Sequence, residues 1–224
     1  MTIQSEALRQ IPIFATLNEQ ELTLVANMAT ERQYERGDII LLEGESGGAL
    51  CYVYRGLVKV FKTSAEGKEQ VLRLIAKGHT FNDVPALDGG PNPASAAAME
   101  ASTIYMIRRA ELQRLIKMEP EVAATVIQML AQALRHVVEL VEDLSLRHVT
   151  ARVAKLLLEQ DTASGDMSRE HRLTQQEMAA IVGTAREVVG RALKELEVAG
   201  AIELHQGRVM IVNKEYLRFV SGIS

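Results

Sequence analysis

The sequence predicts an α+β protein with three parts: a jelly-roll-like β-roll over residues 1–118, a long helix over 119–147 and a winged helix-turn-helix over 148–224. Three observations predict this class. Short apolar alternations broken by glycine run from Arg36 to about Arg108, a stretch without glycine or proline follows Pro120, and two helix starts flank Gly183. These patterns are typical of β-hairpins, of one long helix and of a helix-turn-helix, in that order.

Composition narrows the class further. The 224 residues carry 25 Lys+Arg and 29 Asp+Glu, and 47% are hydrophobic, which excludes disordered, collagen-like and disulfide-rich chains. Cys51 is the only cysteine, the first residues show no secretion signal, and the longest uncharged helical run is too short to span a bilayer. We therefore expect a cytoplasmic protein that makes no membrane contact.

The segment from Glu6 to Glu31 predicts short helices. Asn18 is a plausible N-cap with Glu21 three residues later. The apolar residues that share one face of this helix are Leu17, Leu22, Val25 and Ala26.

The glycine-broken segment that follows predicts antiparallel strands. Its strand positions are β-branched or aromatic, as in Tyr52, Tyr54 and Val58, and its glycines recur at the intervals of turns. Strands do not alternate with helices here, so a parallel sheet is not expected.

After Pro120 the sequence predicts one long helix with an apolar seam. The seam residues, spaced 3, 4, 3, 4 and 3 apart, are Ile127, Leu130, Leu134, Val137, Val141 and Leu144. This spacing is typical of a two-stranded coiled coil and predicts a symmetric homodimer. Packing of the same face on the chain's own β-roll is the alternative.

The stretch from Leu173 to Ile202 predicts a helix-turn-helix. Thr174 with Glu177, and Thr184 with Glu187, have the spacing of two capping boxes ten residues apart. Gly183 lies between them, where a sharp corner needs a left-handed backbone.

The second of these helices has a polar stripe opposite an apolar one. The polar stripe consists of Arg186, Glu187, Gly190, Arg191 and Lys194, and the apolar stripe of Val188, Val189, Ala192 and Leu196. A helix of this width fits the DNA major groove, where arginine binds guanine and a carboxylate accepts from cytosine. The alternatives are an ordinary charged surface and, for Glu187, a purely local capping role.

Downstream, the sequence around Gln206 and Gly207 predicts a two-stranded wing. Arg208, His205 and Gln206 are candidates for contacts to the DNA backbone, which set the register without reading the sequence.

These residues resemble the bacterial superfamily of the cyclic-AMP receptor protein and the fumarate-nitrate regulator. The resemblance covers nearly the whole chain and is strongest from Thr174 to Gly183 and from Arg186 to Arg191. It implies a cyclic-nucleotide-binding-like, effector-sensing β-roll, a dimerisation helix and a DNA-binding domain, with double-stranded DNA and RNA polymerase as partners.

The same resemblance implies individual roles. Residues at the positions of Arg186, Glu187 and Arg191 read a TGTGA-like half-site, and Thr174 and Gln176 lie where phosphate contacts are made. Lys194 and Arg208 are further backbone candidates. Gln175 stands where the receptor protein has an arginine, which weakens one backbone contact. The loop 159–172 corresponds to a segment that touches RNA polymerase in the family.

The effector pocket departs from the family pattern. The cassette has a Gly-Glu-Leu opening and a later Arg-Ser or Arg-Thr pair; here we expect Asn82 in place of the Glu and Ala94 in place of the Arg. A buried phosphate without a cation is prohibitive, so cyclic AMP is not the expected ligand. Asn82, Asp83 and Ser95 are candidates to line a pocket for another small molecule; a filled pocket is the alternative. The cofactor, if any, stays unidentified.

Two other functional classes are alternatives. A haem sensor of the same superfamily would need an axial ligand such as His79, His136 or His148, but scattered histidines are more often surface or capping groups. The iron–sulfur branch needs a cysteine cluster, and Cys51 reads as a buried strand thiol. No catalytic or metal-binding motif is present, so we expect no enzyme; a regulatory subunit of an enzyme is the remaining alternative.

Overall fold

The computed structural model describes residues 8–222 except 10, 16, 47, 163–172 and 206–207. It contains two compact units. The first comprises Met1–Lys62 with Arg73–Val137, and the second comprises Thr63–Leu72 with Val138–Ser224. The boundary falls within one long helix, so the division into functional parts after residues 118 and 147 stays a prediction.

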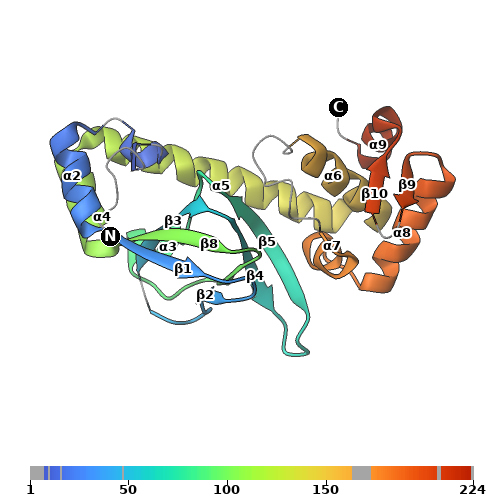
Figure 1. Ribbon diagram of the computed structural model, residues 1–224, viewed down its shortest axis with the longest axis horizontal. Coiled ribbons are helices and arrows are strands. Elements are labelled where there is room, and N and C mark those ends of the chain that lie inside the picture. Colours follow the sequence, from blue (N-terminus) through green and yellow to red (C-terminus); the bar gives the residue numbers. More distant parts are fainter. Residues whose placement is uncertain are drawn as a thin grey trace. The chain divides into compact units, whose positions relative to one another are not determined.

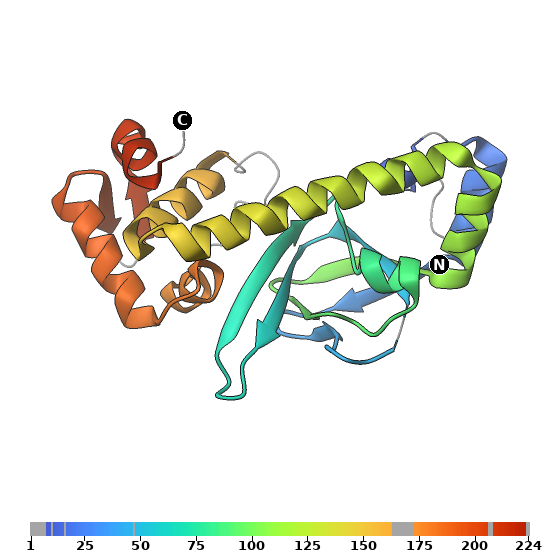
Figure 2. The same cartoon turned by 180° about the vertical axis from the view of Figure 1, so that it is seen from behind.

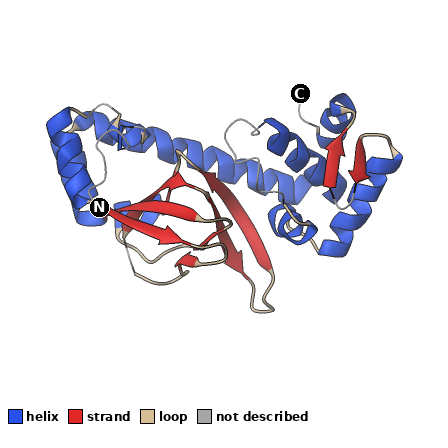
Figure 3. Cartoon of the chain, in the orientation of Figure 1, coloured by secondary structure: helices blue, strands red, loops and turns tan. Residues whose placement is uncertain are grey.

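The N-terminal part is a β-roll of two four-stranded antiparallel sheets, which confirms the predicted class (Figures 1 and 3). One sheet has the order β1-β8-β3-β6 and the other β2-β7-β4-β5. The strands are β1 (Thr30–Tyr34), β2 (Ile39–Leu41), β3 (Ala49–Arg55), β4 (Leu57–Thr63), β5 (Glu69–Ala76), β6 (Thr80–Phe81), β7 (Ser95–Ala98) and β8 (Ser102–Arg108). Helix α3 (Asp83–Asp88) follows β6.

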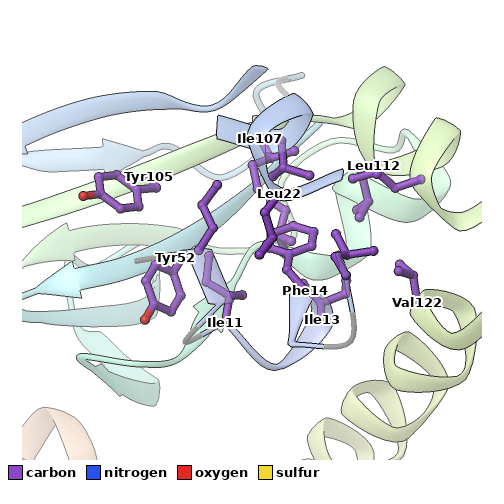
Figure 4. Packing of buried hydrophobic residues seen from close by; sticks show 14 of the residues in the cluster. Ile11, Ile13, Phe14, Leu22, Tyr52, Tyr105, Ile107, Leu112 and Val122 are labelled. Atoms are coloured by element: carbon purple, nitrogen blue, oxygen red, sulfur yellow. The ribbon is translucent and has the colours of Figure 1, made fainter. Parts of the chain in front are cut away.

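Alternate residues of β3 enter two different apolar clusters, because successive side chains of a strand point to opposite faces. Cys51 and Val53 pack with Phe81 and Ile104 in one cluster. On the other face, Tyr52 joins a cluster that includes residues from the N-terminal segment and from helices (Figure 4). The roll is therefore filled by its own side chains on one face and covered by helices on the other.

The covering segments are η1 (Pro12–Phe14), α2 (Glu19–Met28) and α4 (Arg109–Met118). Helix α2 begins at Asn18 in a complete capping box, as predicted: the Glu21 amide donates to Asn18 Oδ1 at 3.1 Å, and the Asn18 amide donates to Glu21 Oε2 at 2.8 Å. Leu22 and Val25 are fully buried. The cap and the apolar face thus place α2 against the roll.

Helix α5 (Pro120–Leu146) is one continuous helix of 27 residues, as predicted (Figure 2). Val122 and Val126 near its start are buried in the cluster that covers the roll. Among the residues that the structure describes, no helix has both the length and the apolar character needed to cross a membrane.

The C-terminal part is a winged helix-turn-helix. It contains α6 (Val149–Thr162), α7 (Gln175–Val182), α8 (Arg186–Val198), β9 (Ile202–His205), β10 (Arg208–Ile211) and α9 (Lys214–Ser221). The two strands pair antiparallel as the predicted wing, whose turn at 206–207 lies outside the described residues. Helix α9, which the sequence analysis leaves unassigned, begins at the N-cap Asn213.

One of the two predicted capping boxes is wrong. Helix α7 begins at Thr174 with both bonds of its box, but the N-cap of α8 is Ala185, which makes no side-chain cap bond. The amide of Thr184 instead donates to the carbonyl of Ala179 at 2.9 Å. This bond belongs to the end of α7, so Thr184 completes the first helix and does not start the second.

Candidate nucleic-acid interface and effector pocket

The corner between α7 and α8 is held by local bonds. The amide of Thr174 donates to Glu177 Oε2 at 2.7 Å, and the amide of Glu177 donates to Thr174 Oγ1 at 3.2 Å. At the other end of α7, Gly183 has φ +72°, a left-handed value that suits glycine. The chain can therefore turn at once into α8.

Helix α8 has the two faces that its sequence predicts. Val189, Ala192 and Leu196 are buried, and so is Leu193, which the predicted stripe omitted. Arg186, Glu187 and Arg191 are exposed. The buried stripe fixes the helix on its domain and leaves the polar stripe open to a partner.

The corrected start of α8 changes the interpretation of Glu187. The Glu187 carboxylate lies in the first turn of α8. It does not form a capping box with Thr184, because the N-cap of α8 is Ala185. Within the described part of the chain, the side chains of Arg186, Glu187 and Arg191 make no hydrogen bond or ion pair with one another or with other residues. The explanation of Glu187 as part of a capping box is thereby removed.

The candidates for backbone contacts differ in their surroundings. Thr174, Gln176 and Arg208 are exposed. Lys194 is exposed as well, but its Nζ donates to Glu197 Oε2 at 2.7 Å. This bond lowers the pKa of Glu197, so a contact of Lys194 with phosphate would have to compete with an existing ion pair.

Further polar contacts lie on strand β9 of the wing and on helix α6. His205 Nε2 lies 2.9 Å from Glu203 Oε2 on β9. Gln206, another backbone candidate, lies outside the described residues. Thr150 Oγ1 on α6 donates to Glu195 Oε2 on α8 at 2.7 Å, which joins the two helices.

Gly190 lies on α8 between Arg186 and Arg191 with room beside it. A Cβ at this position would meet nothing closer than Gln175 Oε1 at 3.7 Å, an ordinary van der Waals distance. Neither a positive φ nor crowding within the chain therefore requires glycine here.

The seam of α5 is open to a partner. Its exposed apolar side chains are Ile127, Leu130, Leu134, Val137, Val138, Val141 and Leu144. Ile127 and Leu134 are 67% and 65% exposed, which is unusual for large apolar residues at regular helical spacing. The face that remains exposed is therefore the one whose heptad spacing predicts a second helix.

In the β-roll, Asn82 has an unusual backbone conformation. Its φ of 62° is the only positive value of a non-glycine residue in the described chain, and its Nδ2 donates to the carbonyl of Ala49 at 3.0 Å. A left-handed φ is the conformation that glycine adopts most readily. It therefore favours an alignment of Asn82 with the glycine of the Gly-Glu-Leu opening and of Asp83 with its glutamate, one position away from the predicted one; both alignments stay predictions.

Asp83, the first residue of α3, carries a buried carboxyl group. Burial raises its pKa, while a hydrogen bond from Thr80 and the charge of Arg73 act in the opposite direction. Its Oδ1 is buried without a hydrogen-bond partner. Because folding favours the protonated form, this group makes the fold less stable as pH rises from the ordinary aspartate pKa through the raised one.

One of the three candidate pocket residues, Asp83, lines an apolar hollow of the β-roll. Its lining consists of Ile13, Leu50, Asp83, Leu87, Leu112, Val126, Met129 and Leu130. Asn82 and Ser95 are not part of this lining, and the Oγ of Ser95 accepts from the Glu43 amide at 3.0 Å. That Asn82, Asp83 and Ser95 line one effector pocket stays a prediction.

The sulfur and histidine candidates gain no support from their surroundings. Cys51 is buried, as predicted, and burial raises the pKa of its thiol. Nδ1 of His79 lies 3.3 Å from the carbonyl oxygen of Lys77. Among the described residues there is no group of three His, Cys, Asp or Glu side chains that could hold a metal ion.

Comparisons with known families match both parts of the chain. The cyclic nucleotide-binding domain family matches residues 31–119, and the Crp-like helix-turn-helix domain family matches residues 151–220. The chain is 32% identical to the cyclic AMP receptor protein of Thermus thermophilus over 200 residues, which cover 89% of this chain and 92% of that protein.

Two further similarities extend over most of the chain. It is 30% identical to the CRP-like cAMP-activated global transcriptional regulator of Mycobacterium tuberculosis over 217 residues, covering 95% of this chain and 97% of the relative. A crystal structure of a regulator of the crp/fnr family from Eubacterium rectale superposes with a TM-score of 0.79 at 21% identity, covering 96% and 99% of the two chains. At this identity the structural likeness shows the fold.

Proposed function

The chain belongs to the CRP/FNR family of DNA-binding transcription regulators, and from this premise we propose that it is a homodimer that reads palindromic DNA with TGTGA-like half-sites. One observation carries the proposal: Arg186, Glu187 and Arg191 are exposed and unpaired on a helix whose opposite stripe is buried. Charged side chains left free on a rigid helix are available to base edges.

Each side chain has a chemical role in this proposal. Arg186 and Arg191 donate to O6 and N7 of guanines, and Glu187 accepts from the amine of a cytosine. Thr174, Gln176, Lys194 and Arg208 contact the backbone and set the register. A carboxylate near phosphates is repelled by them, so the free Glu187 supports base reading over simple phosphate binding.

A gel shift of the full chain tests this function. The probe is a duplex with two TGTGA-like half-sites centred about one helical turn apart, and the control is a duplex of the same composition in scrambled order. We expect the palindrome to bind at least about 1,000-fold tighter. Equal affinity for both duplexes would refute sequence-specific reading.

Gly190 offers an independent test of which face meets DNA. Glycine inside an exposed helix is about 1 kcal/mol less favourable than alanine, and a methyl group fits here without a clash. Gly190→Ala is therefore expected to stabilise the domain by about 0.5–1 kcal/mol and to weaken binding to the palindrome. Thermal melting and gel shift measure the two effects. A more stable variant with unchanged affinity would show that Gly190 does not approach DNA.

The proposal includes a β-roll that does not take cyclic AMP, although the relatives are named for that ligand. Ala94 is buried and supplies no cation for a phosphate. The hydroxyl of Ser95 already accepts a hydrogen bond from the backbone, and Phe81 fills the apolar cluster of the roll. A different small molecule, or none, is then the regulatory signal.

Titration calorimetry checks this prediction. We expect cyclic AMP to bind the full chain more weakly than about 100 µM, since a buried phosphate would lack a partner. The Thermus thermophilus relative, named as a cyclic AMP receptor protein, serves as the positive control. Micromolar binding to the present chain would contradict the argument from Ala94.

Other functions are less well supported. The relatives with at least 30% identity carry the names of cAMP-dependent regulators, so a haem sensor is not favoured and neither is an enzyme subunit. The proposed site of action is the cytoplasm, with RNA polymerase as a further partner. The loop 159–172 expected to touch the polymerase lies mostly outside the described residues.

A further inference from the structure

Arg152, in the first turn of α6, binds the ends of two other helices. Its Nε donates to the carbonyl of Val182, the last residue of α7, at 2.8 Å. Its Nη1 donates to the carbonyls of Arg147 and Asp143 at 2.7 and 3.3 Å. One guanidinium thus joins the last turn of α5 to the corner of the helix-turn-helix.

The carbonyls of Val182 and Arg147 lie at helix ends, whereas that of Asp143 also accepts from the Arg147 amide at 3.3 Å. The last four carbonyls of an α-helix accept no intrahelical bond and carry its negative partial charge. A cation that bonds two such ends at once favours one relative placement of the two helices, because the planar guanidinium donates in fixed directions.

A second contact joins the same two places. A Cβ at Gly183 would lie 2.7 Å from Cδ2 of Leu144, so the α5 side chain packs directly against the corner. Leu144 also ends the apolar seam of α5. The corner residue that precedes α8 therefore contacts the helix face on which a second subunit is proposed to bind.

The neighbouring ion pairs do not contact the corner of the helix-turn-helix. Arg147 Nε and Lys155 Nζ lie 2.8 and 2.5 Å from the carboxylate of Asp143. The Lys155 pair joins α6 to α5, the Arg147 pair is local to the end of α5, and neither involves α7. Lys155 therefore provides a matched control: it removes a cation from the same cluster without touching the corner.

We propose that Arg152 is a positioning residue that transmits the placement of the last turn of α5 to the helix-turn-helix corner, and so to α8. This rests on the proposed function, since it concerns how DNA binding is regulated. A change of α5 at the dimer seam alters the carbonyls of Asp143 and Arg147, and the guanidinium passes the change to Val182.

Hydrogen exchange of the full chain measures this link without DNA. In Arg152→Met, amides of 140–147 and of 178–185 are expected to exchange on the order of tenfold faster. In Lys155→Met, only those of 140–147 are expected to change. Unchanged exchange at 178–185 in Arg152→Met would overturn the proposal. If that variant does not fold, Arg152→Lys, which lacks the planar fork, is expected to show the same acceleration at 178–185, and parent-like exchange there would overturn it.

Gel shift separates positioning from mere stability. Arg152→Met is expected to lose about tenfold of the preference for the palindrome over the scrambled duplex, with little change in binding to the scrambled one. A parent-like preference would overturn the positioning role. If the parent itself shows no preference, the proposed function fails, while the exchange result still decides the link between α5 and the corner.

Discussion

Replacing Leu134 by glutamate is expected to convert the protein into a monomer and to abolish tight binding to the palindrome. Leu134 lies in the middle of the exposed seam of α5. In a symmetric pair of helices, the change removes two buried leucines and buries two carboxylates, at a combined cost of about 5 kcal/mol or more. A monomer also loses the linkage of two half-sites, which is worth about 100- to 10,000-fold in affinity.

Sedimentation equilibrium and gel shift measure these two consequences. Gln132→Glu is the matched control, because it adds the same charge to an exposed position on the opposite side of α5. It is expected to leave both dimer and binding intact. If Leu134→Glu remained a dimer, α5 would not be the dimer interface, and its exposed apolar residues would need another partner.

Arg186→Ala and Arg191→Ala are each expected to reduce the preference for the palindrome over the scrambled duplex by about 5- to 150-fold. A bidentate contact from arginine to guanine contributes about 1–3 kcal/mol of discrimination. Because both side chains are unpaired in the free protein, their removal leaves no orphaned partner within the domain. The loss therefore reports on contacts with DNA rather than on folding.

Two other arginines make the comparison specific. Arg218→Ala removes the same charge from exposed α9 and is expected to leave the preference unchanged. Arg208 is a proposed phosphate contact. Arg208→Ala is expected to weaken binding to both duplexes alike and to reduce the slope of log affinity against log salt concentration by about one. Should the two α8 variants behave like Arg208→Ala, they would be phosphate contacts, and base reading would have to be assigned elsewhere.

Much of the helix-turn-helix can be predicted from sequence because its determinants are local. The bonds of the Thr174–Glu177 box span three residues, and the turn at Gly183 depends on one backbone conformation. The buried stripe of α8 follows from helical periodicity. The same reasoning failed at Thr184, where a hydroxyl three residues before Glu187 has capping spacing but belongs to the end of α7. Spacing alone cannot separate two helices joined by so short a corner.

In the β-roll, contacts between distant elements decide more than local sequence patterns do. Alternating strands and turn glycines predict its class, but they do not predict the backbone conformation of Asn82 or the burial of Asp83. A left-handed Asn82 and a buried Asp83 follow from how β6 enters α3, and from the elements that pack around them. Ser95 likewise has its partner in Glu43, 52 residues away along the chain.

The amino-acid sequence by itself determined where the long helix runs, which residues form its seam and which side chains α8 presents, because these depend on residues within a turn or two. Tertiary structure alone decided that the Glu187 side chain is free, that Asp83 lines an apolar hollow, and that Arg152 joins α5 to the corner beyond α7. In each case the deciding partner lies on another element, and the choice among possible partners is made by packing and by the need to satisfy buried polar groups.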